Sequence, residues 1–477
     1  MEEGLLEREE ERAVRGCYCD FTAEARRLGY LAGPMVGVTL SQYLVQVTSS
    51  MMVGHLGELA LSSSAIATSL SGVTGFSVLV GMASGLDTLC GQAYGARQYK
   101  KLGIHTYRAI FSLILVCIPI SLIWASMEKL LSLVGQDPLI SQEAGKYAIW
   151  MIPGLFAYGT AQPLMKFLQS QNLILPMLLS SFTTLSIHIP LCWVLVFKTG
   201  LGNVGAALSI SISHWINVLI LVLYIKYSDS CKATRLPLSM EAFRGVNEFL
   251  RLAIPSAVMI CLEWWSFELL VLLSGLLPNP RLETSVLSIS LTTIALINTI
   301  SYGIGCAAST RVSNELGAGN PDGAHLAVLV VISIAIVEAL VVSVTLFDLR
   351  QVLGYAYSDE DEVIDYVREM VPLVSISVIM DSCQSVMSGI ARGCGRQHIG
   401  AYVNLGAFYL AGIPISVVLG FLLRIGGKGL WIGILSGATI QTILLGVITT
   451  FTNWQQEAVL ARKRVFEERL PLESSLK

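Results

Sequence analysis

Long apolar segments alternate with short polar ones along nearly the whole chain of 477 residues. Each apolar segment has about 20 mainly hydrophobic residues, the number that a helix needs to cross a bilayer. Six segments precede a polar link at residues 226–247 and six follow it. The pattern predicts an all-α membrane protein with twelve transmembrane helices. The expected spans are Leu28–Val53, Ala60–Cys90, Tyr107–Ala125, Tyr147–Leu168, Leu175–Phe197, Val204–Ile225, Leu250–Ser274, Val286–Ala308, Ala324–Leu346, Met370–Ile390, Ile399–Leu422 and Leu430–Phe451.

Basic residues indicate how these spans are oriented. Of the 31 Lys and Arg residues, 23 lie in or beside the two termini, the central link and the loops on the same side. Because Lys and Arg gather on the cytoplasmic side, both termini are expected in the cytosol. The chain then divides into a cytosolic segment 1–26, an N-terminal half 27–227, a cytosolic linker 228–247, a C-terminal half 248–452 and a cytosolic tail 453–477, which begins as an amphipathic surface helix.

The two halves resemble each other at a shift of about 222 residues. The sequence LAGP ending at Pro34 matches LAIP ending at Pro255, Gly81–Ala96 overlays Gly303–Ala318, and Gln162 falls on Gln384. Each half has an even number of spans, so both insert in the same orientation and are related by an axis along the membrane normal. Two pseudo-symmetric six-helix lobes are predicted, an arrangement typical of transporters with a cavity that opens alternately to either side.

The halves differ in their carboxylates. Glu263 lies near the middle of the seventh span, where the matching position in the first half is Gln42, and Asp381 in the tenth span matches Gly159. A charged group at the centre of a span costs about 2.5–3.5 kcal/mol on insertion scales. Such a cost favours a functional role, so Glu263 and Asp381 are the candidate proton-binding or cation-binding groups.

Polar residues accompany both acids. Gln384 lies one turn from Asp381 on the same helix face. Asn298 and Tyr302 lie on one face of the eighth span, and Trp264 next to Glu263 offers an aromatic face of the kind that binds organic cations. The residues expected to support the site or to bind substrate are therefore Asn298, Tyr302, Gln384, Gln42 and Trp264.

Prolines occur at equivalent places in the two halves. Pro255, two turns before Glu263, cannot donate a backbone hydrogen bond and crowds the carbonyl of Arg251. Kinks in helices usually occur at such positions. Pro255 and its counterpart Pro34 are therefore predicted hinges.

Four further charged residues have competing interpretations. Glu268 is about 140° round the helix from Glu263 and is interpreted as a structural or rim residue. Glu338 is alone in an apolar run, which favours helix packing. Asp87 and Arg311 lie near the cytoplasmic ends of their spans, where ion pairing between lobes or loops is preferred over gating.

Five stretches are distinctive: LAGPMVGVTLSQYL, GMASGLDTLCGQAYGARQY, CLEWWSFE, TRVSNELGAGNP and IMDSCQSVMSGIARGCGRQ. They resemble the multidrug and toxic compound extrusion (MATE) transporters, and most closely their plant DETOXIFICATION branch. The resemblance implies a V-shaped pair of lobes and antiport in which a cytosolic organic compound, often cationic or amphipathic, leaves as protons enter. It places Glu263 and Asp381 at the acidic positions of the family's proton site, with Asn298 and Tyr302 in support. The first span departs from the bacterial pattern, which has an Asp or Asn there, and offers Gln42.

Other functions remain as alternatives. A sodium-coupled antiporter of the same fold is one, and a flippase for lipid-linked precursors is another, although few Lys or Arg residues lie inside the predicted spans. No HExxH, GxSxG or Walker A motif occurs, so a metalloprotease, a hydrolase or an ATP-driven pump is not expected.

Composition limits the partners of the protein. With 53% hydrophobic residues, 14% charged residues and a net charge of -3, the chain is not expected to bind nucleic acid. The expected partners are a small organic substrate, protons and the lipid bilayer. Neither a cofactor nor a metal is expected. A monomer in the plasma membrane or the vacuolar membrane is predicted.

Overall fold

The computed structural model describes the backbone of residues 3–237, 245–358 and 360–467, and the side chains of this part from Asp20 to Phe466. Within these ranges the chain is helical and has no β-strand. The all-α prediction is therefore confirmed. The expected segments 1–26, 228–247 and 453–477 lie partly outside the described residues.

Helices follow one another with short connections. Those up to the central link are α1 (Glu3–Gly54), α2 (Glu58–Ser71), η1 (Gly72–Phe76), α3 (Ser77–Ala83), α4 (Gly85–Gly95), α5 (Tyr99–Ala125), α6 (Met127–Leu133), α7 (Pro138–Ser170), α8 (Ile174–Trp193), η2 (Val194–Lys198), α9 (Gly202–Tyr227) and η3 (Asp229–Cys231). Those after it are α10 (Val246–Ser274), α11 (Pro280–Ala318), α12 (Pro321–Asp348), η5 (Leu349–Gln351), η6 (Gly354–Ala356), α13 (Asp361–Cys394), α14 (Gln397–Asn404), η7 (Leu405–Gly412), α15 (Ile413–Val417), η8 (Val418–Leu422), α16 (Gly427–Thr450) and α17 (Trp454–Glu467).

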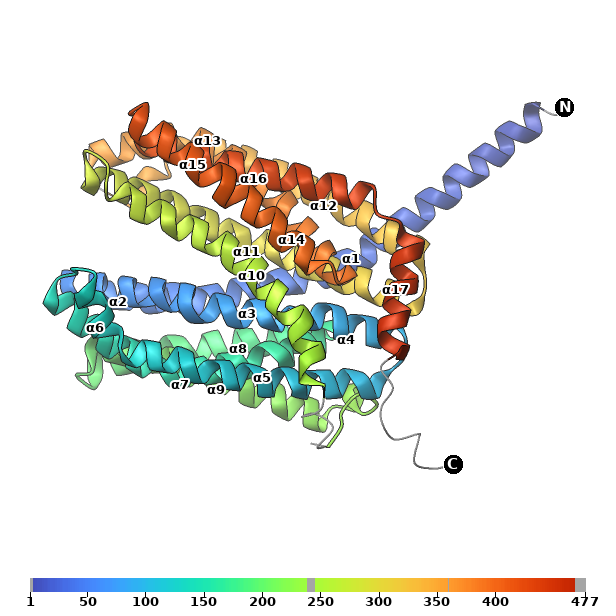
Figure 1. Ribbon diagram of the computed structural model, residues 1–477, viewed down its shortest axis with the longest axis horizontal. Coiled ribbons are helices and arrows are strands. Elements are labelled where there is room, and N and C mark those ends of the chain that lie inside the picture. Colours follow the sequence, from blue (N-terminus) through green and yellow to red (C-terminus); the bar gives the residue numbers. More distant parts are fainter. Residues whose placement is uncertain (1–2, 238–244, 359, 468–477) are drawn as a thin grey trace.

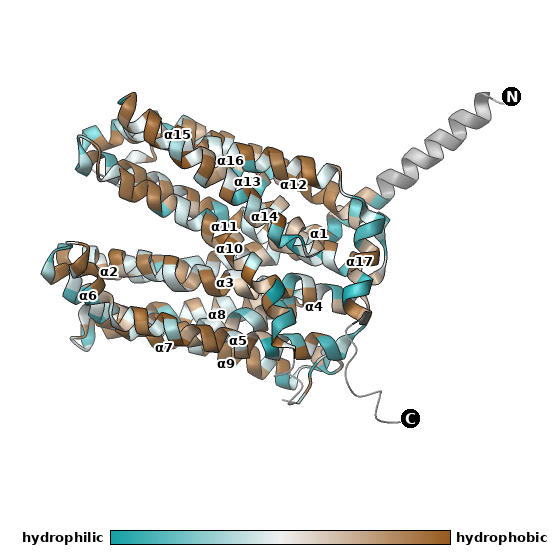
Figure 2. Cartoon of the chain, viewed as in Figure 1, coloured by the Kyte–Doolittle hydropathy of each residue, from teal (hydrophilic) through white to brown (hydrophobic). Residues whose placement is uncertain are grey.

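Many of these helices are apolar along most of their length, as Figure 2 shows. Among the described residues, nine helical segments are long and apolar enough to cross a membrane. The helices α1, α7 and α13 are also long, with 52, 33 and 34 residues, but they are not among these nine. Both α7 and α13 pack against several other helices. Their polar residues can therefore be satisfied inside the protein.

The helices form two groups that lie closest at one end (Figure 1). In the first group α7 packs against α2, α5 and α9, and in the second α13 packs against α11, α12 and α16. The groups contact each other through α4 with α11 and through α3 with α10, while α1 contacts both α8 and α11. In Figure 1 the end where the groups converge is the end with α4 and α17.

The contact between α4 and α11 is reciprocal. A Cβ atom on Gly95 would lie 2.0 Å from the carbonyl oxygen of Asn314, and a Cβ atom on Gly317 would lie 2.1 Å from the carbonyl oxygen of Gln92. Gly317 is the counterpart of Gly95, and Asn314 the counterpart of Gln92, at the shift found in the sequence. The close approach of Gly95 to Asn314 and that of Gly317 to Gln92 are therefore equivalent contacts, related by exchanging the two halves.

A second pair of contacts follows the same rule. A Cβ atom on Gly81 of α3 would lie 2.5 Å from the Cα atom of Ala257 on α10, and one on Gly303 of α11 would lie 2.8 Å from the backbone nitrogen of Val36 on α1. These residues again correspond at the repeat shift. The internal repeat therefore has a structural counterpart in how the halves pack.

Gly317→Ala is expected to lower the melting temperature of the purified protein in detergent. The added methyl group would meet backbone atoms of Gln92, which cannot rotate away as a side chain can, so α4 and α11 must separate. Overpacking of this kind typically costs about 1–3 kcal/mol. Gly33→Ala is the matched control, because nothing lies within 4 Å of a Cβ atom there. Equal melting temperatures for the two variants would contradict the tight contact.

The helix predicted in the tail is present as α17, and it has a buried face. Arg464 Nη1 donates to Gln92 Oε1 on α4 at 3.1 Å and to the carbonyl oxygen of Cys394 on α13 at 3.0 Å. Lys101 Nζ on α5 donates to the carbonyl oxygen of Val465. This helix therefore contacts both groups of helices where they converge.

Candidate functional site

A hydrogen bond joins α10 to α13 at the first predicted acid. Gln384 Nε2 donates to Glu263 Oε2 at 2.6 Å, and it lies 3.5 Å from the hydroxyl oxygen of Ser388 one turn further along α13. The Gln384 side chain is buried and Glu263 is half-buried. The structure thus brings together two of the residues predicted from sequence.

The second acid lies one turn away. Asp381 is 6% exposed, and its Oδ2 atom has no hydrogen-bond partner among the described residues. Residues three apart share a helix face, so Asp381 is on the face of α13 that carries Gln384. The carboxylates of Asp381 and Glu263 interact electrostatically. Two neighbouring acids in an apolar setting can hold a proton or ligate a small cation.

Two further amides form a chain of hydrogen bonds that begins at Glu263. Gln441 on α16 interacts with the Glu263 side chain and donates to Asn404 Oδ1 on α14 at 2.6 Å. Asn404 Nδ2 in turn donates to the carbonyl oxygen of Met259 on α10 at 2.7 Å. Sequence reasoning missed both amides, although a polar residue inside an apolar span was the available signal.

The predicted supporting residues on α11 have different partners. Arg392 lies 6.0 Å from the centre of the Tyr302 ring. Asn298 is half-buried, and the structure gives it no polar contact within the described residues. Ser301, between them, pairs with Ser382 of α13 at 2.8 Å. The structure therefore does not gather Asn298 and Tyr302 around Glu263 in the way it gathers Gln384.

Gln42 and Trp264 take no part in the hydrogen bond between Glu263 and Gln384. Gln42 Nε2 donates to the sulfur of Met165 at 3.0 Å within the first group of helices. The Trp264 side chain is 43% exposed. Its neighbour Trp265 donates to the carbonyl oxygen of Val73 on η1 at 3.0 Å.

Both predicted hinges lie inside unbroken helices. Pro255 is in α10 and Pro34 is in α1. Two residues before Pro255, Ala253 lies close to Gly85 of α4. Two residues after it, Ala257 lies close to Gly81 of α3. The turn of α10 with the missing hydrogen bond is therefore in contact with the other half.

Three of the four further charged residues, Glu268, Glu338 and Arg311, are in structural contacts. Ser69 on α2 donates to Glu268 Oε2 at 2.7 Å, so Glu268 links the two groups of helices. Glu338 on α12 accepts a 3.5 Å hydrogen bond from Ser301, which agrees with the packing interpretation. Arg311 pairs with Glu24 at 2.7 Å and with Glu315 at 2.6 Å, as the ion-pair interpretation expects.

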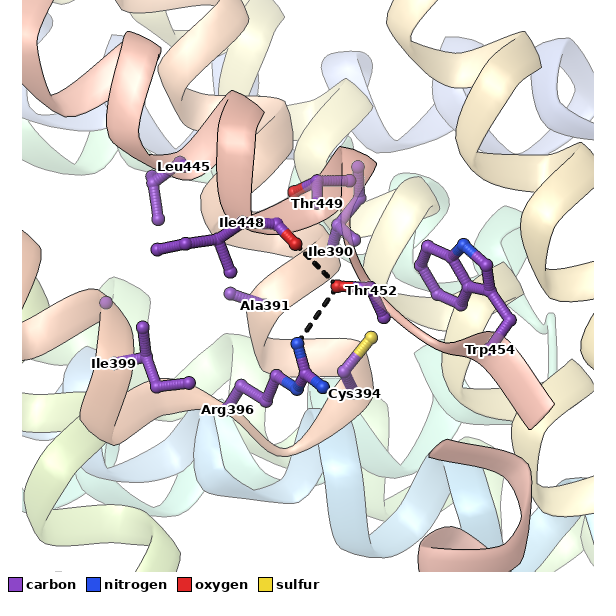
Figure 3. Close-up of a pocket in the computed structure, with 11 residues that line it drawn as sticks. Ile390, Ala391, Cys394, Arg396, Ile399, Leu445, Ile448, Thr449, Thr452 and Trp454 are labelled. Atoms are coloured by element: carbon purple, nitrogen blue, oxygen red, sulfur yellow. Dashed lines mark hydrogen bonds between the residues drawn. The ribbon is translucent and has the colours of Figure 1, made fainter. Parts of the chain in front are cut away.

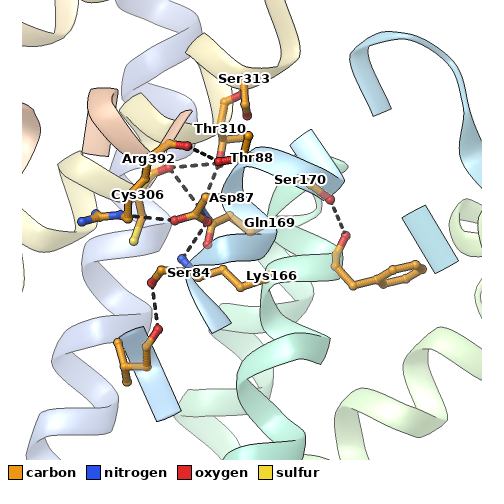
Figure 4. Close-up of polar contacts among 12 residues, drawn as sticks. Ser84, Asp87, Thr88, Lys166, Gln169, Ser170, Cys306, Thr310, Ser313 and Arg392 are labelled. Atoms are coloured by element: carbon orange, nitrogen blue, oxygen red, sulfur yellow. Dashed lines mark hydrogen bonds and ion pairs between the residues drawn. The ribbon is translucent and has the colours of Figure 1, made fainter. Parts of the chain in front are cut away.

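A buried ion cluster lies between the halves (Figure 4). Lys166 Nζ on α7 is 2.8 Å from Asp87 Oδ1 on α4, and Arg392 Nε on α13 is 3.4 Å from Asp87 Oδ2. Gln169 Nε2 is 3.4 Å from Asp87 Oδ1 and also donates to Thr310 on α11 at 3.0 Å. We call Asp87, Lys166 and Arg392 the ion cluster.

All three members of the ion cluster are at most 5% exposed. Charges buried to this degree need partners, because desolvation costs several kcal/mol per ion. The ion-pair interpretation of Asp87 is confirmed. That few basic groups lie inside the spans stays a prediction: Lys166 lies two residues before the end of its predicted span, and Arg392 lies two residues beyond the end of another.

A small cavity lies elsewhere, near α17 (Figure 3). It has a volume of about 20 Å³, and its wall includes Ile390, Leu445 and Trp454. Arg396 beside it donates to Thr452 Oγ1 at 2.9 Å. This volume is enough for about one water molecule. Neither Glu263 nor Asp381 lines the cavity.

Comparisons with known proteins decide the family. A family model described as MatE matches residues 34–194 and 255–418, more than half of the chain. The chain belongs to the MatE family. This MATE chain is 56% identical to Protein DETOXIFICATION 12 of Arabidopsis thaliana over 445 residues, which cover 93% of the chain and 92% of the relative. It is also 56% identical to Protein DETOXIFICATION 14 of the same plant, over 97% of the chain and 96% of the relative.

Solved structures agree. The crystal structure of the eukaryotic MATE transporter AtDTX14 superposes with a TM-score of 0.91 at 56% identity, covering 94% of this chain and all of that one. The fold is shared, at a TM-score of 0.82 and 15% identity, with a multidrug resistance MATE transporter in an outward-facing conformation. This MATE chain is therefore an integral, multi-pass membrane transporter of a multidrug and toxin efflux family, and its relatives are not enzymes.

Proposed function

We propose that the protein exports small organic compounds, cationic or amphipathic, in exchange for protons. The observation that carries this proposal is the 2.6 Å hydrogen bond between Glu263 and Gln384, with the buried Asp381 one turn away. A pair of acids in this setting binds a proton where the outer medium reaches it and releases the proton when the site opens to a more alkaline solution.

The proposed architecture has twelve spans in two six-helix lobes, at residues 27–227 and 248–452, with both termini in the cytosol. Nine described segments meet the length and hydropathy that a span requires, and α1, α7 and α13 supply the other three. The reciprocal contacts of Gly95 and Gly317 support two lobes related by a pseudo-twofold axis. We further propose that a single copy of the chain is the working unit.

In the proposed cycle, protonation from the outer side neutralises Glu263 and Asp381. The loss of charge lets α10 bend at Pro255 and reshapes the space between the lobes, so that substrate leaves. Each unit of pH difference supplies about 1.4 kcal/mol per proton. A membrane potential of 100 mV adds about 2.3 kcal/mol per charge moved. One proton can therefore drive about a tenfold gradient per pH unit.

Sodium is the second candidate for the coupling ion. The Oδ2 atom of Asp381, which has no hydrogen-bond partner among the described residues, favours a bound cation without deciding its identity. Carboxylate oxygens are ligands that hard cations prefer. Lipid-precursor flipping is a weaker alternative, because both cations of the ion cluster already face Asp87.

Proteoliposomes test the proposal. Acid-loaded vesicles in an alkaline medium that contains choline in place of sodium should accumulate a fluorescent organic cation such as ethidium, because protons leave as the dye enters. Vesicles without protein and vesicles with equal pH on both sides are the controls. Accumulation that follows an imposed sodium gradient but not the pH gradient would assign the coupling to sodium instead.

A further inference from the structure

A line of polar residues along α13 connects the acid site to the ion cluster. Asp381, Gln384, Ser388 and Arg392 are spaced by three, four and four residues, which places them on one helix face. The Gln384 amide bonds to Glu263 and reaches Ser388. At the end of this line the Arg392 guanidinium interacts with both Glu263 and Asp87. Arg392 is therefore positioned between the two sites.

Arg392 is held less tightly than its burial would suggest. It is 3% exposed, yet its Nε and Nη2 atoms have no hydrogen-bond acceptor among the described residues. Lys166 pairs with Oδ1 of Asp87 at 2.8 Å, and Arg392 makes a 3.4 Å ion pair with Oδ2 that lacks hydrogen-bond geometry. A buried Arg usually makes several charge-assisted hydrogen bonds. An unsatisfied group of this kind needs an explanation.

The end of α13 that carries Arg392 is tied to α4 of the other half. Thr88 Oγ1 donates to the carbonyl oxygen of Arg392 at 2.5 Å, and Gln92 Nε2 donates to that of Gly393 at 3.1 Å. Gln397 Nε2 donates to Thr88 Oγ1 at 2.7 Å. The contact lies where the halves converge. Any movement that separates the halves there must also break the ion pair between Asp87 and Arg392.

We propose that Arg392 is a positioning residue that couples the charge of Glu263 to closure of the contact between α4 and α13. The inference rests on the proposed function for the change of charge at Glu263. The ionisable groups that interact with Arg392 are Asp87 on α4, Glu263 on α10, and Tyr302 and Cys306 on α11, and Lys166 on α7 shares Asp87 with it.

Charge balance gives the direction of the coupling. When Glu263 is ionised, Arg392 has an ion pair with Asp87 and a further electrostatic attraction toward Glu263. When Glu263 is neutral, Asp87 is the one carboxylate left for Arg392, so the contact between α4 and α13 tightens. Coupling of this kind is reciprocal. Closure of the contact therefore favours the neutral form of Glu263.

Distances between spin labels test this in the full chain. Labels at Tyr227→Cys on α9 and Tyr402→Cys on α14, which are 72% and 73% exposed, report the separation of the halves. Cys17, Cys19 and Cys383 are replaced by serine to prevent stray labelling. Four forms of the labelled protein are measured in lipid nanodiscs: without a further change, with Glu263→Gln, with Arg392→Met, and with both changes. Glu263→Gln imitates the neutral acid.

Glu263→Gln should shift the distances toward the shorter population, and Arg392→Met should shift them toward longer distances. With Arg392→Met present, Glu263→Gln should have no further effect, whereas Arg392→Lys should keep part of the response. A merely structural Arg392 would leave the response to Glu263→Gln unchanged, and that result overturns the inference. If Arg392→Met does not fold, the double variant Asp87→Asn/Lys166→Met serves the same purpose, because it removes the partner of Arg392 and leaves one uncompensated charge instead of two.

This measurement needs neither substrate nor a pH gradient, so it separates the two proposals. Loss of proton-driven uptake in Glu263→Gln with unchanged label distances would leave the proposed function standing and refute the coupling. Distances that respond as expected in a protein without proton-driven uptake would refute the proposed function and leave the coupling between charge and conformation.

Discussion

Glu263→Gln is expected to abolish accumulation of substrate driven by a pH gradient while the protein stays folded. Glutamine keeps the size of the side chain, and its amide oxygen can still accept from Gln384 Nε2, but it cannot take up a proton. One proton per substrate corresponds to about tenfold accumulation per pH unit. The variant should therefore show no accumulation above the equal-pH control. Dye uptake into acid-loaded proteoliposomes measures it.

A second acid on the same helix provides the matched control. Glu268→Gln makes the same chemical change five residues away, at a half-buried side chain that bonds to Ser69 instead of Gln384. It should retain accumulation. Asp381→Asn should behave like Glu263→Gln, because the two carboxylates interact. Undiminished accumulation in both Glu263→Gln and Asp381→Asn would refute the assignment of the coupling site.

The sequence predicts the helices well because apolar length is a local property. The predicted ends are less accurate. The eighth span was expected to end at Ala308, whereas α11 continues to Ala318. Its last three turns include Arg311 and Asn314, which pair with Glu24 and with the carbonyl oxygen of Ser170. A helix can continue through polar residues when these residues bond to other helices. Hydropathy cannot predict such a continuation, because it depends only on the residues of the segment itself.

The same reason explains which site residues the sequence identified. Glu263 and Asp381 stand out as acids inside apolar runs, and Gln384 follows from its spacing to Asp381. The importance of Lys166 and Arg392 depends on Asp87, which is 79 and 305 residues away in the chain. Only the packing of α4 against α7 and α13 brings these charges together. Spacing along one helix cannot predict contacts between three helices.

Asp87→Asn is expected to cause the largest loss of stability among single changes in the ion cluster. Lys166 and Arg392 would remain buried, with exposures of 5% and 3%, without the carboxylate that they share. Removing one partner of a buried ion pair typically costs about 3–5 kcal/mol, because the charge left behind is not compensated. Thermal unfolding in detergent, followed by tryptophan fluorescence, should show a large fall in the melting temperature.

Removing a cation as well should reverse part of this loss. The double variant Asp87→Asn/Lys166→Met keeps the volume of the lysine stem but leaves one uncompensated charge instead of two, so it should melt above Asp87→Asn. The control is the exposed pair of Glu369 and Lys428, whose side chains are 61% and 34% exposed. Exposed pairs contribute about 0–1 kcal/mol, so Glu369→Gln should melt close to the unmodified protein. If Asp87→Asn also had a melting temperature close to that of the unmodified protein, the ion cluster would not hold the two halves together. Its charges would then have to be stabilised by solvent that enters between the halves.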